Sequence, residues 1–240
     1  MQNHNQQPAL PSMGPITSAI KKPEPCPQCQ GTGWVPFTRP DGYSAVRECE
    51  CARLRRLRAR IATILQDWKE YAGASFDAFK PINLGQQAIA DIMRANITGS
   101  YYISGQYKRG KTFLLICQYR QLALAGQKCI LRCARDLVDE LRRSEVPATK
   151  DADVVPSPVL QMVNLADAGH LFIDDIEKVA NTDFRMAMLW NILDTIKRRQ
   201  LSLTVSSNLP MIGTAGKDLK SKLGSEIISR IDQICREITI

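Results

Sequence analysis

The sequence has little that would place this chain in a membrane or outside the cell. No hydrophobic run in it approaches the roughly 20 residues that a membrane span requires. The polar residues 1–7 lack the basic and then apolar pattern of a secretory signal, and the sequence has no internal repeat. We therefore expect a cytoplasmic protein that does not contact a membrane.

The excess of charge of one sign is modest as well. The 240 residues include 32 Lys and Arg against 24 Asp and Glu, a formal charge of +8, which permits a polyanionic partner without requiring one. Hydrophobic residues make up 44% and charged residues 23%, so wholesale disorder and a fibrous chain are excluded. The length suits one mid-sized globular domain with a small appendage.

The chain is predicted to have three parts. Residues 1–25 are rich in Gln, Asn, Pro and Ser and should form a disordered tail. Residues 26–71 contain closely spaced cysteines and then apolar residues at three- and four-residue steps, which predicts a small module followed by a helix over residues 52–68. Residues 72–240 alternate short apolar segments with amphipathic stretches, which predicts an α/β domain with a parallel sheet flanked by helices. The strands are expected at residues 101–104, 129–133, 170–173 and 201–205.

The strongest chemical signal is a phosphate-binding loop. Residues 105–112 read GQYKRGKT and satisfy the pattern G-x-x-x-x-G-K-[ST]. The loop lies between an expected strand and an expected helix over residues 112–122, so that backbone N–H groups and a helix N-terminus point at the phosphates of a nucleotide. A chance match in a glycine-containing turn is the alternative, and the flanking elements argue against it. The residues expected to bind ATP are Gly105, Gln106, Tyr107, Lys108, Arg109, Gly110, Lys111, Thr112 and Phe113.

A magnesium site is expected beside this loop. Lys111 should neutralise the terminal phosphates, and Thr112 should offer its hydroxyl to Mg²⁺. A later apolar strand ends in two acids, of which Asp174 is the expected second ligand of Mg²⁺. Asp175 is expected to orient or deprotonate the attacking water, a role for which Glu177 competes. By itself a strand that ends in two acids is more often a solvated strand end, and the loop favours the metal site.

A third element follows the last expected strand. That strand ends in small polar residues and Asn208. An amide at the carboxyl edge of a parallel sheet can contact the γ-phosphate or its attacking water, because ligands bind at that edge. Alone, an Asn before Leu-Pro is a turn former, and its order after the other two motifs favours a catalytic role.

Taken in order, these motifs resemble those of the bacterial DnaC/DnaI helicase loaders and their IstB-type relatives, which are P-loop ATPases of the AAA+ class. The resemblance covers residues 72–240 and rests on the segments 75–79, 105–112, 131–141, 171–175, 204–208 and 229–230. It implies an AAA+ fold, ATP hydrolysis as the activity, and ATP bound between neighbouring subunits. Self-association through the ATP site is therefore expected.

The resemblance also implies roles for residues near the C-terminus. Arg230 matches an arginine finger, which stabilises charge in the neighbouring subunit's site during phosphoryl transfer. A solvated arginine on a helix is the alternative. Arg236 is a weaker candidate for sensing the nucleotide. Only ten residues follow Arg230, too few for the helical lid that most AAA+ proteins carry, so a full C-terminal lid is not expected.

Four cysteines form two close pairs, Cys26 with Cys29 and Cys49 with Cys51. This number and grouping is typical of a structural Zn²⁺ site, and the first pair resembles a zinc knuckle of the DnaJ cysteine-rich kind. A redox pair or free thiols are the alternative. The remaining cysteines are expected to fill the core, namely Cys117, Cys129, Cys133 and Cys235.

A basic helix is expected directly after the cysteines. It carries Arg53, Arg55, Arg56, Arg58 and Arg60. Such a helix can follow a nucleic-acid backbone or dock on an acidic protein surface, and a solvated face is the plain alternative. The resemblance favours partner docking, because in these loaders the N-terminal region binds the replicative helicase.

The most specific functional hypothesis is an ATP-dependent loader. It would deliver a DnaB-type replicative helicase onto single-stranded DNA, with ATP binding and hydrolysis controlling assembly and release. The alternative is an IstB-like ATPase that assists a transposase in DNA target selection, which the core motifs cannot distinguish from a loader. A zinc-bearing nucleic-acid-binding protein whose ATP site is a static assembly switch is a third possibility.

Overall fold

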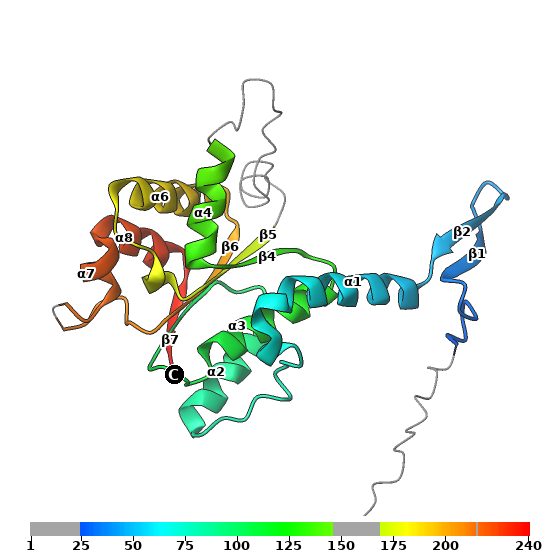
Figure 1. Cartoon of the computed structure of the whole chain (residues 1–240). Coiled ribbons are helices and arrows are strands. Elements are labelled where there is room, and N and C mark those ends of the chain that lie inside the picture. Colours follow the sequence, from blue (N-terminus) through cyan, green and yellow to red (C-terminus); the bar gives the residue numbers. More distant parts are fainter. Residues whose placement is uncertain (1–24, 146–168, 215) are drawn as a thin grey trace, which may run out of the picture. The chain divides into compact units, whose positions relative to one another are not determined.

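The computed structural model describes residues 25–145, 169–214 and 216–240 (Figure 1). The chain divides into two compact units, one that ends at Arg53 and one that begins at Leu54. The sequence places this boundary near residue 71 instead. The difference arises because Ile61 and Leu65, which follow the boundary, are buried in the core of the second unit. Residues 1–24 of the expected tail lie outside the described residues.

The first unit contains an antiparallel hairpin of β1 (Trp34–Thr38) and β2 (Ser44–Glu48) that the sequence analysis did not anticipate. The turn between the strands has Pro40 at its second position and Gly42 at its fourth. The N–H group of Gly42 donates to the carbonyl of Arg39 at 2.9 Å, and Gly42 has a φ of +85°. Proline presets the turn and glycine accepts the left-handed conformation, so this segment reverses the chain tightly.

The second unit is built on a five-stranded sheet in which every neighbouring pair is parallel. The order across the sheet is β4-β5-β6-β3-β7. The strands are β3 (Tyr101–Ser104), β4 (Lys128–Cys133), β5 (Gly169–Asp174), β6 (Ser202–Ser207) and β7 (Arg236–Thr239). Because the strands are parallel, the segments that follow β3, β5 and β6 emerge at one edge of the sheet.

The expected parallel α/β sheet is confirmed, with all four predicted strands present. The fifth strand, β7, was missed because Ile238 is the only apolar side chain among its four residues and because it begins two residues after the end of α8. Pairing with β3 holds it in place, and the N–H group of Arg236 donates to the carbonyl of Ser100 at 3.0 Å. Long-range pairing therefore made a strand where the local sequence gave no clear signal.

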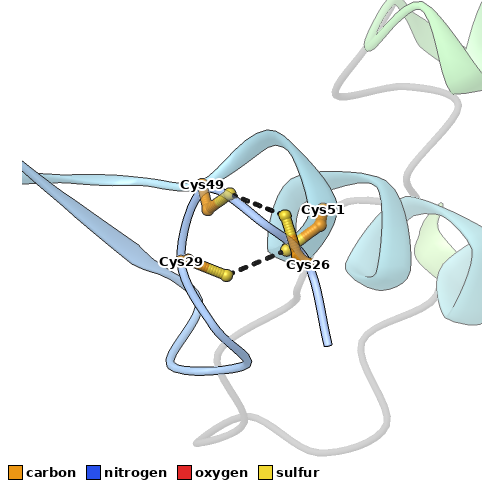
Figure 2. Close-up of side chains that lie close together, drawn as sticks. All are labelled: Cys26, Cys29, Cys49 and Cys51. Atoms are coloured by element: carbon orange, nitrogen blue, oxygen red, sulfur yellow. Dashed lines mark hydrogen bonds between the residues drawn. The ribbon is translucent and has the colours of Figure 1, made fainter. Parts of the chain in front are cut away.

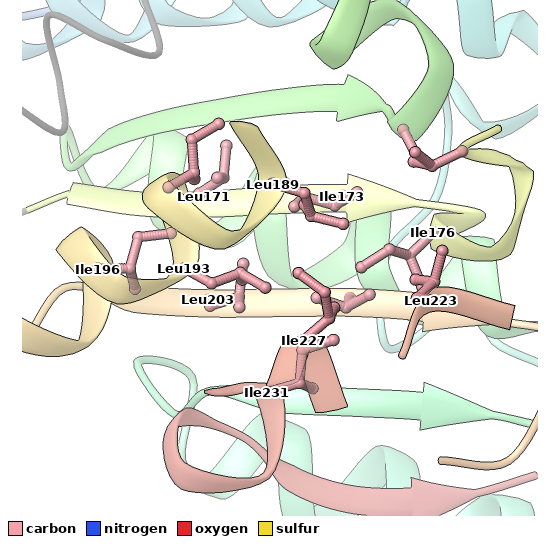
Figure 3. Packing of buried hydrophobic residues seen from close by; sticks show 14 of the residues in the cluster. Leu171, Ile173, Ile176, Leu189, Leu193, Ile196, Leu203, Leu223, Ile227 and Ile231 are labelled. Atoms are coloured by element: carbon pink, nitrogen blue, oxygen red, sulfur yellow. The ribbon is translucent and has the colours of Figure 1, made fainter. Parts of the chain in front are cut away.

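Helices cover both faces of the sheet (Figure 1). On one face lie α2 (Leu84–Ala95) and α3 (Lys111–Leu124), which pack on Tyr101, Ile103 and Phe172 of the strands. On the other face lie α4 (Ala134–Glu145), α6 (Asp183–Arg198), α7 (Leu219–Leu223) and α8 (Ser225–Ile234). Leucine and isoleucine side chains of β5, β6, α6 and α8 interdigitate there (Figure 3). No helix among residues the structure describes combines the length and apolarity needed to cross a membrane.

The predicted helix over residues 52–68 begins earlier and ends differently. Helix α1 spans Glu50–Ile64, and the 3₁₀ helix η1 (Leu65–Tyr71) continues from it. Trp68 leaves the helical conformation, with φ −122° and ψ 43°. The buried Leu65 and a hydrogen bond of the Trp68 indole hold this distorted turn against the second unit's sheet. Tertiary contacts thus override the helical periodicity.

A chain of buried polar groups crosses the sheet beneath α3. Thr204 donates its hydroxyl hydrogen to the side-chain oxygen of Gln118 at 2.8 Å, so Nε2 of His170 must be the donor to Thr204, also at 2.8 Å. Gln118 in turn donates to the carbonyls of Ile97 and Gly99, both at 2.8 Å. Burial lowers the pKa of His170 to about 3, so this imidazole is neutral.

Candidate functional site

Two glycines shape the phosphate loop between β3 and α3. Gly105 has a φ of +148°, and a Cβ atom there would lie 2.0 Å from the backbone oxygen of Ile240. Gly110 has a φ of +94° at the N-cap of α3, and a Cβ atom there would lie 2.9 Å from the ring of Phe79. Both positions therefore require glycine, which explains why the motif has this residue at its first and sixth positions. The loop delivers the chain to the N-terminus of α3.

Lys111 is the first residue of α3 and is only 5% exposed. Its ammonium group donates to the carbonyl of Gln106 at 2.9 Å and to Oδ1 of Asn208 at 2.8 Å. Burial lowers the pKa of Lys111, and the nearby carboxylates of Asp175 and Glu177 oppose that shift. The lysine and the asparagine that the sequence assigned to one site therefore meet across two loops.

Asp174 is the last residue of β5 and lies at the same carboxyl edge of the sheet as Lys111 and Asn208. Thr112 donates to Oδ1 of Asp174 at 3.0 Å, so the two expected Mg²⁺ ligands are in contact. Ser206 donates to the same oxygen at 2.5 Å, and the indole of Trp68 donates to Oδ2 at 3.2 Å. Burial raises the pKa of Asp174, and the hydrogen bonds from Ser206, Trp68 and Thr112 oppose this. Neither Ser206 nor Trp68 was predicted to contact the metal ligands.

The two acids that competed for the catalytic role are placed differently. Asp175 adopts a φ of +55°, pairs with Lys178 at 2.5 Å and lines a cavity beside the phosphate loop. Glu177 is 7% exposed and accepts a hydrogen bond from Nδ2 of Asn208 at 2.5 Å. Its other oxygen has no hydrogen-bond partner among the described residues. Asp175 therefore faces the space where a ligand would bind, and Glu177 holds the amide of Asn208.

These side chains surround a cavity of about 510 Å³, within the size range of small-molecule sites. Residues of η1 close one side of it, and the loop residues that line it run from Tyr107 to Thr112. Gly105, Gln106 and Phe113 belong to the predicted ATP-binding set but do not line this cavity. The lining residues are Asp67, Trp68, Glu70, Tyr71, Tyr107, Lys108, Arg109, Gly110, Lys111, Thr112, Cys133, Asp136, Asp174, Asp175, Lys178 and Asn208.

A second hollow of about 420 Å³ shares Tyr71 and the loop residues 108–110 with this cavity. Its walls are largely apolar and include Phe79, Ile82 and Phe113. The rings of Phe79 and Phe113 lie 5.6 Å apart. Phe113 therefore lies beside the phosphate loop in a setting that suits a flat apolar group rather than a phosphate.

Arg230 does not line the cavity of its own chain. It lies on α8, where it pairs with Asp194 at 3.2 Å and stacks over the ring of Trp190 at 5.4 Å from the ring centre. Its Nε atom is buried without a hydrogen-bond partner among the described residues. The role of Arg230 as an arginine finger in a neighbouring subunit stays a prediction, as does a sensing role for Arg236, which is exposed on β7.

The first unit brings the four predicted zinc ligands together (Figure 2). Their sulfur atoms all lie within 4.8 Å of one another, with 3.9 Å between Cys26 and Cys49 and 3.4 Å between Cys29 and Cys51. Zinc–sulfur bonds of about 2.3 Å in a tetrahedron place sulfur atoms about 3.8 Å apart. The cluster therefore has the number of ligands and the spacing that a tetrahedral Zn²⁺ site needs.

Proton sharing within the cluster also fits a cation site. The backbone N–H group of Gly33 is the main reason that the pKa of Cys29 is lowered to about 6. The pKa of Cys51 is raised to about 12, chiefly by its hydrogen bond with Cys29. One thiol of this pair is thus favoured as thiolate at the expense of the other. A divalent cation would relieve this competition, because thiolates are the form that binds zinc.

The remaining cysteines agree with the sequence prediction except for one. Cys117, Cys129 and Cys235 are buried in the core of the second unit. Cys133 was also expected to fill the core, but it is only half-buried and lines the cavity beside the phosphate loop. This prediction was wrong because Cys133 is the last residue of β4, at the open edge of the sheet, where side chains face the cavity.

The basic residues of α1 are largely exposed. Arg53 pairs with Glu50 one turn earlier, with 2.6 Å between the charged atoms, whereas Arg55, Arg58 and Arg60 present their side chains to solvent. A run of this kind is compatible with docking and with a solvated face, so the docking role stays a prediction.

No protein-family model and no curated protein matches this sequence. Solved structures do share its fold. The DnaC helicase loader has a TM-score of 0.60 at 18% identity, over 72% of this chain and 99% of that chain. DnaI has a TM-score of 0.52 at 18% identity, over 72% and 90%. The replication initiator DnaA bound to AMPPCP and single-stranded DNA has a TM-score of 0.51 at 14% identity, over 70% of this chain and half of DnaA. Over about 70% of its length, this chain thus shares the fold of these three solved structures.

Proposed function

We propose that this protein binds and hydrolyses ATP in the cavity beside the phosphate loop. The observation that carries the proposal is the meeting of Lys111, Thr112, Asp174 and Asn208 at one edge of the sheet. These four groups come from two strands and the loop-to-helix junction, and a chance match to the loop pattern would not bring the other two to it. The fold shared with DnaA bound to an ATP analogue supports the same ligand.

Each residue has a role that its contacts suit. Lys111 would exchange its hydrogen bond with Asn208 for the terminal phosphates, and the N–H groups at the start of α3 would bind the inner phosphates. Thr112 and Asp174 would hold Mg²⁺, which supplies positive charge to the phosphates during transfer. The apolar hollow with Phe79, Ile82 and Phe113 would accept the base. The indole of Trp68 would have to leave Asp174 when the metal binds.

Asp175 is the better candidate to orient or deprotonate the attacking water. It lines the cavity, whereas Glu177 does not and is occupied by the amide of Asn208. The carboxylate of Glu177 can only accept hydrogen bonds, so it turns Nδ2 of Asn208 toward itself and leaves Oδ1 facing Lys111. When Lys111 moves to the phosphates, that oxygen becomes free to accept a hydrogen bond from the water.

The wider function that we propose is that of a helicase loader. ATP would control its self-association around single-stranded DNA and the delivery of a DnaB-type replicative helicase. The fold shared with the DnaC loader and DnaI supports this assignment. Arg230 would leave Asp194 and complete the ATP site of a neighbouring subunit. Residues 26–71 would dock on the helicase, with Zn²⁺ on Cys26, Cys29, Cys49 and Cys51 holding the module folded.

The test of the ATP site is a binding and turnover measurement on the full chain. We expect saturable binding of a fluorescent ATP analogue with Mg²⁺, and phosphate release that single-stranded DNA changes. Lys111→Ala should abolish binding, and Lys220→Ala, an exposed lysine on α7, should leave it unchanged. A folded sample that takes up no nucleotide would contradict the proposal.

The test of the loader role is a direct interaction measurement. We expect the full chain to form a complex with a purified DnaB-type helicase on native mass spectrometry, and to raise the amount of helicase bound to a single-stranded DNA circle. Association with a transposase in place of the helicase would instead favour the IstB-like function. ATP binding without either interaction would leave the ATPase assignment standing and remove the loader.

A further inference from the structure

One face of the hairpin in the first unit carries side chains that the fold does not use. The pairing places Phe37 opposite Ala45 and Val35 opposite Arg47. The N–H group of Arg39 donates to the carbonyl of Tyr43 at 2.9 Å and so extends the ladder by one pair. Because successive residues of a strand point to opposite sides, these side chains share one side. We call it the hairpin face, made of Val35, Phe37, Arg39, Tyr43, Ala45 and Arg47.

The aromatic rings of the hairpin face are open to solvent. Tyr43 is 73% exposed and Phe37 is 39% exposed, and neither belongs to either hydrophobic core cluster. The small Ala45 opposite Phe37 leaves one side of the phenyl ring uncovered. Exposed rings of this kind contribute little to folding, because the apolar surface stays in water. Two such rings on one short hairpin therefore call for a role in binding.

The charges of the hairpin face are of one sign. Arg39 and Arg47 are exposed, and within residues 25–145, 169–214 and 216–240 neither forms an ion pair. None of the six residues of this face is acidic. On the opposite side of the hairpin the charged residue is Glu48, which accompanies Trp34 and Val46. The two sides of one hairpin thus differ in charge, and only the hairpin face complements an anion.

Aromatic rings between arginines suit a strand of nucleic acid with unpaired bases. Each base can stack on an aromatic ring, and each phosphate can pair with a guanidinium. Tyr43 and Arg47 both lie diagonal to Phe37 across the two strands, at the roughly 7–8 Å spacing of such neighbours. A ring flanked at this distance by another ring and a cation has room for one base beside it. A duplex would not fit this arrangement, because its bases are already stacked on one another.

We propose that the hairpin face binds single-stranded nucleic acid, with Phe37 and Tyr43 stacking on bases and Arg39 and Arg47 contacting phosphates. This surface belongs to the first unit, and none of its six residues lines the ATP cavity. The inference does not depend on ATP hydrolysis and would stand if the ATP site proved inactive.

The test is fluorescence anisotropy with the full chain free of nucleotide. The probes are fluorescein-labelled oligothymidylate, oligouridylate and a DNA duplex. The double variant Phe37→Ala, Tyr43→Ala should weaken binding of the single strands by about tenfold or more, since each stacked base is worth about 1–3 kcal/mol. The double variant Arg39→Ala, Arg47→Ala should also make binding less dependent on salt. The slope of log K against log salt concentration should fall in magnitude by about one or more, which corresponds to the loss of at least one phosphate contact.

The matched control is Trp34→Ala, Val46→Ala, which removes one ring and one aliphatic side chain from the opposite side of the same hairpin. Binding should be unchanged in that variant. The zinc content of every variant should equal that of the wild type, which shows that the cysteine cluster and the hairpin attached to it are folded. Equal weakening by the control would overturn the proposal.

A crosslink locates the strand directly. An oligonucleotide with 5-iododeoxyuridine, irradiated in complex with the wild type, should attach to Phe37 or Tyr43 when the peptides are read by mass spectrometry. Crosslinks confined to residues 54–240 would overturn the proposal. So would variants of the hairpin face that bind oligonucleotides normally but no longer bind a DnaB-type helicase, because that result would make the face a protein contact.

Discussion

Replacing Glu177 by Gln tests how the side-chain amide of Asn208, for which we propose a catalytic role, is oriented. The carboxylate of Glu177 accepts a hydrogen bond from Asn208, while Lys111 donates to the other end of the same amide. A glutamine keeps the size of the side chain and removes its charge. It also places an amide group where the second carboxylate oxygen now lies without a hydrogen-bond partner among the described residues. The substitution therefore weakens the hydrogen bond between residue 177 and Asn208 without opening a cavity.

The magnitude follows from the charge of this hydrogen bond. Hydrogen bonds to charged groups contribute about 1.5–3 kcal/mol and those between neutral groups about 0.5–1.5 kcal/mol. Glu177→Gln should therefore weaken the hydrogen bond that orients the Asn208 amide by about 1–1.5 kcal/mol. If this loss appears in full in the activation free energy, kcat falls about five- to tenfold. The KM for ATP should stay within about twofold, because Glu177 does not line the cavity.

The assay is steady-state phosphate release by Glu177→Gln, Asn208→Ala and the double variant, each checked by thermal unfolding. If Glu177 acts only through Asn208, its substitution should change kcat by less than about twofold once Asn208 is absent. Independent, multiplying effects would refute this reasoning. A loss of about a hundredfold or more in Glu177→Gln, together with a mild effect of Asp175→Asn, would instead make Glu177 the general base.

Three further predictions concern zinc, the metal ligand and pH. Cys29→Ser should reduce the zinc content from about one ion per chain to near none by a colorimetric zinc assay, while ATP binding to the second unit is retained. Trp68→Phe should tighten binding of Mg²⁺ and ATP about fivefold, the equivalent of about 1 kcal/mol, because it removes the indole N–H that competes for Asp174. Equilibrium titration measures this affinity, and weaker binding by the variant would contradict the prediction. Neutral His170 contributes stability that is complete above its ordinary pKa of 6.5 and is lost as the pH falls toward its pKa of about 3 in the folded chain. Urea unfolding below pH 6.5 should therefore show a loss of up to about 1.4 kcal/mol per pH unit that is absent in His170→Gln.

Local patterns in the sequence determined the phosphate loop, the strand before it and the helix after it. They did so because glycine at residues 105 and 110 meets a backbone requirement that no other residue satisfies there. The sequence also predicted the cluster of the two cysteine pairs, because ligands that are close in sequence are held close by the chain itself. The strands ending at Asp174 and near Asn208 were recognisable from their apolar runs, and parallel strands bring such ends to one edge.

Only the tertiary structure decided which side chains complete the site. Trp68 and Asp174 are 106 residues apart in sequence, and their contact depends on a distorted turn that helical periodicity does not predict. Packing between separate elements likewise produces the hydrogen bond from Asn208 to Glu177 and the position of Cys133 beside the cavity. Where side chains of separate elements meet, their directions depend on long-range packing and burial. A sequence pattern shows only the hydrophobic periodicity within one helix or strand at a time.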